Sequence, residues 1–296
     1  MRVLISGASG LLGSAIVRTL ETRGAVITRL VRGSASGNSQ ILWKPGKPLT
    51  LPSTFDAVIH LAGESVVGRW TAAKKARIRD SRVQGTRTLA EAVARMETKP
   101  QVLVAASAIG YYGNRGDEVL TEASPSGTGF LAEICREWEA ASEPAERAGV
   151  RVVHIRTGVV LSKQGGALGK MLLPFRLGLG GRLGKGRQWW SWIHVDDIVG
   201  TVLRVLHTNT LRGAVNLVSP NPVTNAEFTS ALGTTLSRTA ILPAPAFALR
   251  LALGEMADEV LLASQRVQPA QLLAGGYEFS FRELGAALAN ILNKPS

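Results

Sequence analysis

The chain has 296 residues, of which 45% are hydrophobic and 19% charged, the balance of a folded globular protein rather than a disordered one. Its formal net charge of +12 comes from scattered lysines and arginines, so no specific nucleic-acid partner is expected. The one cysteine, Cys135, excludes an intramolecular disulfide and suits a reducing compartment. With no leader-like segment and no apolar stretch of about 18 residues, we expect a cytoplasmic protein without a membrane partner.

Strand and helix patterns alternate along the first half of the chain. Short apolar runs predict buried parallel strands at residues 2–6, 25–31, 56–61, 101–106 and 151–156, with a shorter strand near 41–43. Helical spacing predicts helices at residues 11–23, roughly 71–96, and 128–148. A β–α–β–α order predicts an α/β fold in which helices cover both faces of a doubly wound parallel sheet.

The pattern changes after about residue 160. Residues 163–187 are rich in glycine, and a tryptophan-containing segment then leads into a helix at about 197–207. A strand is expected near 214–218, followed by a mainly helical remainder with a short strand at 277–279. We therefore expect a first domain at residues 1–160, completed by about 194–212. A smaller, mainly helical substrate-side region would comprise residues 161–193 and 213–296.

A glycine-rich turn, Gly7 to Gly13, stands between the first strand and the first helix. Gly7 permits a tight turn, Gly10 lets the backbone approach a pyrophosphate, and Gly13 allows close packing of the helix on the strand. Free N–H groups and the dipole of the following helix then face the phosphates. A glycine turn without a ligand is the alternative, but the strand–turn–helix context favours a dinucleotide site.

The end of the second strand indicates which dinucleotide is bound. NAD sites usually place an acid there, on the 2′-hydroxyl of the ribose. This chain reads Leu30-Val31-Arg32-Gly33-Ser34, with no acid. The guanidinium of Arg32 suits a 2′-phosphate, so the sequence favours NADP(H) over NAD. The alternative is a solvated arginine at a strand end.

These residues resemble the short-chain dehydrogenase/reductase superfamily, on its extended, epimerase-like side. His60-Leu61-Ala62-Gly63 is similar to its fourth-strand signature, and Ser107 to its catalytic serine position. More narrowly, the chain resembles an atypical NAD-dependent epimerase/dehydratase-like subgroup of "epimerase family" proteins, sometimes labelled cell-division-inhibitor-like. Further strings that carry this resemblance are Arg69-Trp70-Thr71, Ser107 to Gly113, Cys135 to Glu139, Arg156 to Leu161, Pro220 to Asn225 and Arg266 to Pro269.

The resemblance covers almost the whole chain and implies a Rossmann-type fold that binds NADP(H). It supplies no substrate. It places the following residues at the cofactor: Gly7, Ser9, Gly10, Leu11, Leu12, Gly13, Arg32, Leu61, Ala62, Gly63, Glu64 and Arg82.

The acid/base pair that the superfamily uses for hydride chemistry is absent from this sequence. That pair is a tyrosine followed four residues later by a lysine, whose charge favours the phenolate. None of the 3 tyrosines has a lysine at that spacing. Aligning the helix that should carry the pair puts Leu131 at the tyrosine position and Cys135 at the lysine position. Cys135 itself reads as a small buried hydrophobe rather than a reactive thiol.

Two hypotheses follow from this absence. In the first, the protein is an NADP-dependent oxidoreductase or epimerase, with Ser107 as hydroxyl donor and Tyr111 or Tyr112 as substitute proton carrier. The alternative for these two tyrosines is a packing role in the wall of the pocket. Its substrate would be a small molecule, such as a sugar nucleotide or a small carbonyl compound. In the second, the protein binds NADPH without turnover, as a sensor or regulatory partner.

Other candidate residues have simpler interpretations. His194 precedes Asp196 and Asp197, which favours a helix N-cap over a catalytic role. The histidines stand far apart without close-spaced acids or cysteines, so no metal site is expected. The resemblance also implies a homodimer through two long helices, at about 71–96 and 130–148.

Overall fold

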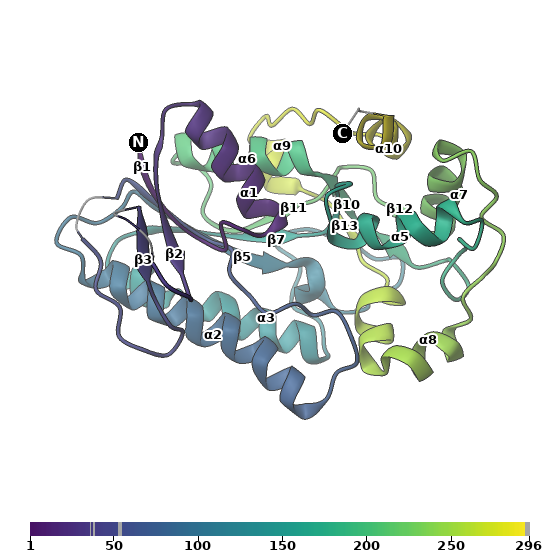
Figure 1. Ribbon diagram of the computed structural model, residues 1–296, viewed down its shortest axis with the longest axis horizontal. Coiled ribbons are helices and arrows are strands. Elements are labelled where there is room, and N and C mark those ends of the chain that lie inside the picture. Colours follow the sequence, from purple (N-terminus) through teal and green to yellow (C-terminus); the bar gives the residue numbers. More distant parts are fainter. Residues whose placement is uncertain (36, 38, 53–54, 294–296) are drawn as a thin grey trace.

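The computed structural model describes residues 1–35, 37, 39–52 and 55–293 (Figure 1). Its centre is a seven-stranded sheet of order β11-β7-β5-β4-β1-β2-β3, in which every neighbouring pair is parallel. The strands are β1 (Arg2–Ser6), β2 (Val26–Val31), β3 (Gln40–Leu42), β4 (Ala57–His60), β5 (Val102–Ala108), β7 (Arg151–Thr157) and β11 (Gly213–Leu217). This arrangement confirms the predicted doubly wound, Rossmann-type sheet.

Helices cover both faces of the sheet (Figure 1). One face carries α1 (Leu11–Thr22) and α6 (Val195–His207), and the other carries α2 (Ala72–Arg95), α3 (Phe130–Ala140) and α4 (Glu143–Arg147). The single helix predicted at 128–148 is therefore two helices. Pro144 lies in the first turn of α4, where its missing N–H costs nothing. In the interior of a longer helix it would break the backbone hydrogen bonds, so α3 ends before it.

Alternate residues of the strands supply two separate cores. Val3 and Ile5 of β1 face α1 and α6, where they pack with Ile16 and Val202. Leu4, between them in the sequence, faces the opposite core under α2. Because successive side chains of a strand point to opposite faces, an unbroken apolar run is what a strand covered on both sides requires.

The rest of the chain packs at one end of the sheet around a third core, which includes Trp190, Trp192 and Phe228. Its helices are α5 (Gly166–Arg176), α7 (Asn225–Thr235), α8 (Ala246–Leu253), the π-helix η2 (Ala257–Leu261), α9 (Ala270–Ala274) and α10 (Leu284–Asn293). Its short strands are β8 (Val159–Leu161), β9 (Trp189–Trp190), β10 (Trp192–His194), β12 (Val223–Thr224) and β13 (Arg266–Val267). Two further elements, the 3-10 helix η1 (Ile109–Tyr112) and β6 (Val119–Leu120), follow β5.

Two details differ from the sequence expectations. The strand expected near residue 214 is β11, an edge strand of the main sheet, although residues from 213 onward were expected in the substrate-side region. The short strand expected at 277–279 is not a strand, because the Tyr277 backbone N–H donates at 2.9 Å to the Leu272 carbonyl oxygen and so closes the turn after α9. Within the described parts of the chain, no helix has the length and apolar character needed to cross a membrane.

Candidate cofactor site and active site

The turn between β1 and α1 lies where the strand order of the sheet reverses, at the carboxyl ends of β1 and β4. Ligands of open α/β sheets bind in the crevice at this position. Gly7 has φ +73°, and a Cβ added there would lie 2.8 Å from the carbonyl carbon of Leu61. A Cβ on Gly13 would lie 2.1 Å from the carbonyl oxygen of Gly7. The backbone therefore packs too closely at both positions for any residue but glycine.

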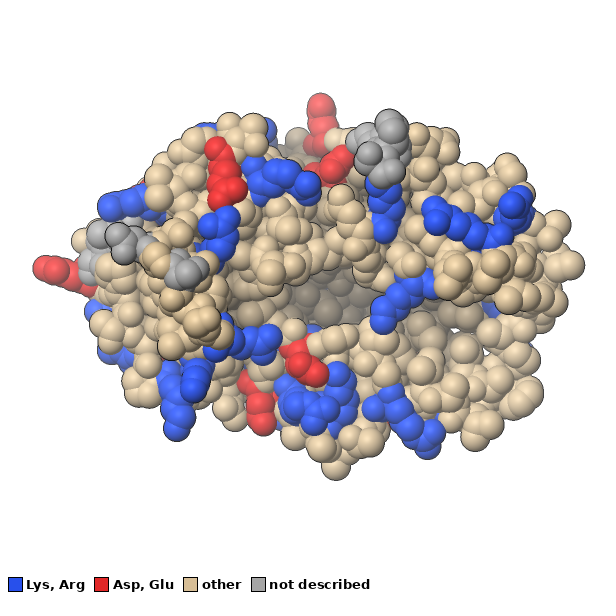
Figure 2. Space-filling view, in the orientation of Figure 1, with Lys and Arg blue, Asp and Glu red and all other residues tan. Residues whose placement is uncertain are grey.

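The start of α1 fits the phosphates of a dinucleotide. Its N-cap, Gly10, provides no side-chain hydrogen bond, and its first turn holds no acid. The first N–H groups of a helix have no acceptor within the helix, so they can receive an anion. The loop before α5 closes over this point, since a Cβ on Gly166 would lie 3.2 Å from Leu11 Cδ2. Figure 2 shows this face of the molecule hollowed at its centre, beside the end of β5 as placed in Figure 1.

A buried hydrogen bond joins the ends of β1 and β4. The Ser6 hydroxyl lies 2.6 Å from Nδ1 of His60, and both side chains are fully buried. Burial lowers the pKa of His60 to about 4, so its imidazole is neutral at physiological pH. The edge of this ring packs against Trp43, at a centroid distance of 5.7 Å. His60 thus fixes the strand end that presents Leu61 to the glycine turn.

Arg82 of α2 supports the segment that follows β4. Its Nη1 donates to the carbonyl oxygen of Glu64 at 2.9 Å and to that of Ile78 at 3.2 Å. Its guanidinium lies over the ring of Trp138, 4.9 Å from the centroid, and its carbon would lie 3.4 Å from a Cβ on Gly63. Desolvation lowers the pKa of this buried guanidinium. Arg82 therefore holds the backbone of residues 63–64 in place.

Three cations gather around Glu64. Lys74 Nζ donates to Glu64 Oε1 at 2.8 Å, and Arg77 Nε lies 3.9 Å from the same oxygen. The hydrogen bond from Lys74 is the main cause that lowers the pKa of Glu64, and the charges of Lys74, Arg77 and Arg32 add to it. Arg32, exposed just after β2, makes the smallest of these contributions. This side of the crevice is cationic.

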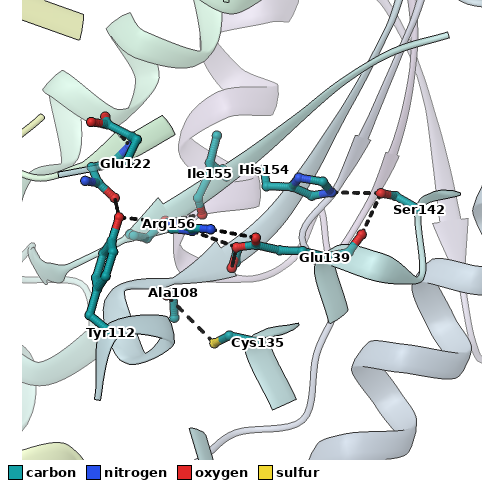
Figure 3. Close-up of polar contacts among 12 residues, drawn as sticks. Ala108, Tyr112, Glu122, Cys135, Glu139, Ser142, His154, Ile155 and Arg156 are labelled. Carbon is teal, nitrogen blue, oxygen red and sulfur yellow. Dashed lines mark hydrogen bonds and ion pairs between the residues drawn. The ribbon is translucent and has the colours of Figure 1, made fainter. Parts of the chain in front are cut away.

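A buried ion pair joins β7 to α3 beside the end of β5 (Figure 3). Arg156 of β7 donates from Nε and Nη2 to the two carboxylate oxygens of Glu139 on α3, each at 2.8 Å. Their side chains are 5% and 13% exposed. The Ser107 hydroxyl donates to Glu139 Oε1 at 2.7 Å. The serine expected to donate to a substrate is thus bonded to a carboxylate that is already paired.

The two tyrosines of η1 meet the same arginine but differ in their hydroxyls. The Tyr112 hydroxyl donates to Asn216 Oδ1 at 2.7 Å and accepts from Arg156 at 3.0 Å, and burial raises its pKa. The side chain is fully buried. Tyr111 is half-buried, with its ring face 3.4 Å from the Arg156 guanidinium carbon. Among the described residues, the Tyr111 hydroxyl has no hydrogen-bond partner.

The positions aligned with the missing acid/base pair are apolar in the structure. Cys135 is buried, with Sγ 3.8 Å from the Ala108 carbonyl oxygen, and burial raises the pKa of its thiol to about 12. Leu131 packs on η1, where a Cβ on Gly110 would lie 3.2 Å from its own Cβ. His194 caps α6, since its Nδ1 accepts from the Asp196 N–H at 3.0 Å. None of these three supplies a proton carrier to the crevice.

Glu139, Lys74 and Arg77 belong to the site but were not predicted from the sequence. Glu139 carried a usable signal, because it follows Cys135 by four residues and so shares its buried face of α3. Its partner, Arg156 on β7, is distant in the sequence, and no local pattern predicts that the two residues pair. In the sequence, Lys74 and Arg77 look like ordinary solvent-exposed residues of a helix. Their role follows only from the structure, in which α2 lies against Glu64.

A glycine turn at the reversal point of a parallel sheet, with a serine at the end of β5, defines a dinucleotide-binding protein of the short-chain dehydrogenase/reductase type. The chain belongs to the NAD dependent epimerase/dehydratase family, whose profile matches residues 3–217. A second profile, described as a domain of unknown function (DUF1731), matches residues 244–291. It covers α8, η2, β13, α9 and most of α10.

Similar proteins extend over the full chain. An epimerase family protein of Mycobacterium bovis is 43% identical over 297 residues, which cover 99% of this chain and 98% of that protein. The crystal structure of human epimerase family protein SDR39U1 (isoform2) with NADPH matches at a TM-score of 0.91 and 36% identity, over 100% of both chains. A nucleoside-diphosphate sugar epimerase from Corynebacterium glutamicum matches at a TM-score of 0.82 and 39% identity, over 99% of this chain and 58% of that one.

Proposed function

We propose that this chain binds NADP(H) at the β1–α1 turn and acts as an oxidoreductase or epimerase on a small molecule. The observation that carries the proposal is the glycine turn itself, where Gly7 packs on the Leu61 backbone and the first N–H groups of α1 have no side-chain cap. The NADPH in the human relative's crystal structure supports the same cofactor. Sugar nucleotides and small carbonyl compounds are the substrate classes to test.

Arg32 is the residue that we propose selects NADP(H) over NAD(H). It stands just after β2, and its charge helps to lower the pKa of Glu64, the carboxylate that pairs with Lys74 and Arg77. A guanidinium pairs well with a 2′-phosphate, and NADH offers no such group. The cytoplasm and a homodimer through α2 and α3 remain our proposals for location and assembly.

Titration of both cofactors tests this assignment. Arg32→Ala should raise the Kd for NADPH about tenfold or more, the loss expected for a hydrogen bond to a charged group. Its Kd for NADH should stay close to that of the wild type. The matched control is Arg29→Ala, three residues earlier, in β2, because Arg29 pairs with Glu21 on α1 instead. An equal loss for both cofactors in Arg32→Ala would refute the 2′-phosphate role.

When bound, NADP(H) supplies hydride transfer at its nicotinamide ring. We propose that Ser107 and Tyr111 face the reacting end of the substrate. Of the two tyrosines, Tyr111 is the better proton carrier, because its hydroxyl has no partner in the described part of the chain. The Tyr112 hydroxyl already holds Asn216 and Arg156 together. Glu139 and Arg156 act as positioning residues for Ser107 and for the Tyr111 ring.

A second function, NADPH sensing without turnover, is favoured by the apolar Leu131 and Cys135 and by the engaged Ser107 hydroxyl. To separate the two, NADPH binding should be followed by fluorescence while NADPH oxidation is assayed against carbonyl compounds. Sugar nucleotides should be followed for epimerised product. Binding without any reaction supports the sensor.

For the enzyme, Tyr111→Phe should lower kcat about a hundredfold, the typical contribution of a general acid or base. An unchanged rate in Tyr111→Phe would eliminate Tyr111 as proton carrier.

A further inference from the structure

Large apolar side chains are exposed on one end of the molecule. Helix α8 reads Ala-Phe-Ala-Leu-Arg-Leu-Ala-Leu, yet none of its residues is buried. Phe247 and Leu251 are 72% and 76% exposed, and Ile241, just before the helix, is 75% exposed. The exposed apolar residues of this end include Leu173, Leu177, Leu179, Ile241, Phe247 and Leu251. We call these residues, together with the cations around them, the basic apolar face. Large apolar side chains that gather at one end of a protein point to an interaction surface.

Backbone hydrogen bonds hold the parts of this face together. The Leu242 N–H donates to the Gly180 carbonyl oxygen at 3.2 Å, and the Ala244 N–H donates to that of Arg182 at 2.9 Å. The segment before α8 therefore runs beside the segment after α5. Figure 1 shows α5, α7 and α8 at the end of the molecule opposite β2 and β3. The exposed residues thus come from neighbouring segments of a single end, rather than from scattered sites.

The same end is rich in positive charge. Residues 163–187 include six lysines and arginines and no acid. In Figure 2 the right-hand end of the molecule shows basic side chains and no acidic ones. Within the described ranges, the following exposed cations have no acidic partner: Lys170, Arg176, Arg182, Lys185, Arg187 and Arg238. Arg250 on α8 differs, since it pairs with Asp258.

This charge decides between two occupants of the face. A second copy of the chain, packed by a two-fold axis, would bring the same cations against one another, while the acids that follow α8, Glu255 and Asp258, are already paired with Lys75 and Arg250. An anionic lipid surface offers phosphates to the cations and an acyl boundary to Phe247, Leu251 and Ile241. We propose that the basic apolar face docks this protein peripherally on anionic bilayers.

The proposal revises the expectation of no membrane partner. That expectation rested on the absence of a long apolar stretch, which is the pattern of a spanning helix. A short interfacial helix with basic neighbours leaves no such pattern. The proposal is also independent of cofactor binding, because the face lies outside the β1–α1 turn.

Flotation with lipid vesicles tests the proposal on the full chain. The wild type should float with vesicles of phosphatidylcholine and phosphatidylglycerol, but not with phosphatidylcholine alone, and high salt should weaken binding. The double variant Phe247→Glu/Leu251→Glu should lower binding about tenfold or more, since it removes apolar contact and adds repulsion. Leu42→Glu, on the far edge strand β3 and 50% exposed in the wild type, is the matched control and should bind like the wild type.

NADPH titration of each variant shows whether it is folded. Arg176→Ala/Arg182→Ala provides a second test, because it should weaken binding to anionic vesicles without altering the apolar residues. The proposal fails if the wild type does not float with anionic vesicles, or if the Phe247→Glu/Leu251→Glu variant floats equally well. It also fails if the wild type stays off vesicles and is a dimer that this double variant converts to a monomer. That result would assign the face to self-association.

Discussion

At the residue scale, the candidate active site depends on the charge balance between Arg156 and Glu139. The Arg156 side chain is 5% exposed and receives its only acidic contact in the described structure from Glu139. The pKa of Arg156 is raised because Glu139 and Tyr112 outweigh the desolvation that opposes them. The same carboxylate also accepts from Ser107. Removing it would leave a buried cation unpaired and a serine hydroxyl without its acceptor.

We therefore expect Glu139→Gln to lower the free energy of unfolding by about 3–5 kcal/mol, the cost of leaving a buried charge unpaired. Glu143→Gln is the control, since the Arg147–Glu143 pair is exposed, at 77% and 45%. Such a surface pair contributes about 1 kcal/mol or less. Urea unfolding measures both variants. Equal unfolding midpoints for the two variants would show that the buried pair stabilises the protein no more than the exposed pair does.

Residues governed by local rules were predictable, and those governed by tertiary pairing were not. Gly7 and Gly13 are needed because neighbouring backbone atoms lie too close to leave space for a Cβ. The strand–turn–helix pattern of the sequence predicts this close packing. Ser107 follows a strand end that apolar periodicity locates. Glu139 meets Arg156 only because of how α3 packs relative to β7. The hydrophobic pattern of the sequence does not determine that packing. The charge of Arg156 likewise gives no sign in the sequence that it would be buried.

At the element scale, the C-terminal region stabilises the helix that carries Glu139. The N-cap of α3, Gly129, has no side chain to cap the helix. Instead, the Glu259 carboxylate of η2 accepts from the N–H groups of Phe130 and Leu131, at 3.2 and 3.1 Å. This contact spans the two family profiles, because residue 259 lies in the second one. A distant element thus supplies the anion that a helix N-terminus favours.

Glu259→Ala should therefore destabilise the protein by about 1 kcal/mol, the usual cost of losing an N-cap. Asp258→Ala, at the adjacent position, removes only an exposed pair with Arg250 and should cost less. Gly129→Ala should cost more than Glu259→Ala, since its Cβ would strike the same carboxylate and φ is +101° there, a conformation that alanine adopts only with strain. Thermal unfolding compares the three variants. A Glu259→Ala variant as stable as Asp258→Ala would rule out this cap.

At the scale of the whole molecule, burial of neutral histidines makes stability depend on pH. His60 and His154 are both buried, and desolvation lowers the pKa of each. For His60 the fall is from 6.5 to about 4. Above pH 6.5 the imidazole is neutral in both states and its burial costs no charge. As the pH falls from 6.5 towards 4, only the unfolded chain takes up the proton, so stability is lost.

From these values, His60 alone should remove about 3 kcal/mol between pH 6.5 and 4, and the loss should level off below pH 4. The raised pKa of Asp197 acts in the opposite direction at the acid end, so the test compares variants rather than the wild type alone. Urea unfolding across this range should show a shallower slope for His60→Gln, because glutamine does not titrate. His207→Gln, at the exposed end of α6, should run parallel to the wild type. Parallel profiles for all three proteins would mean that His60 takes up a proton as readily in the fold as in the unfolded chain.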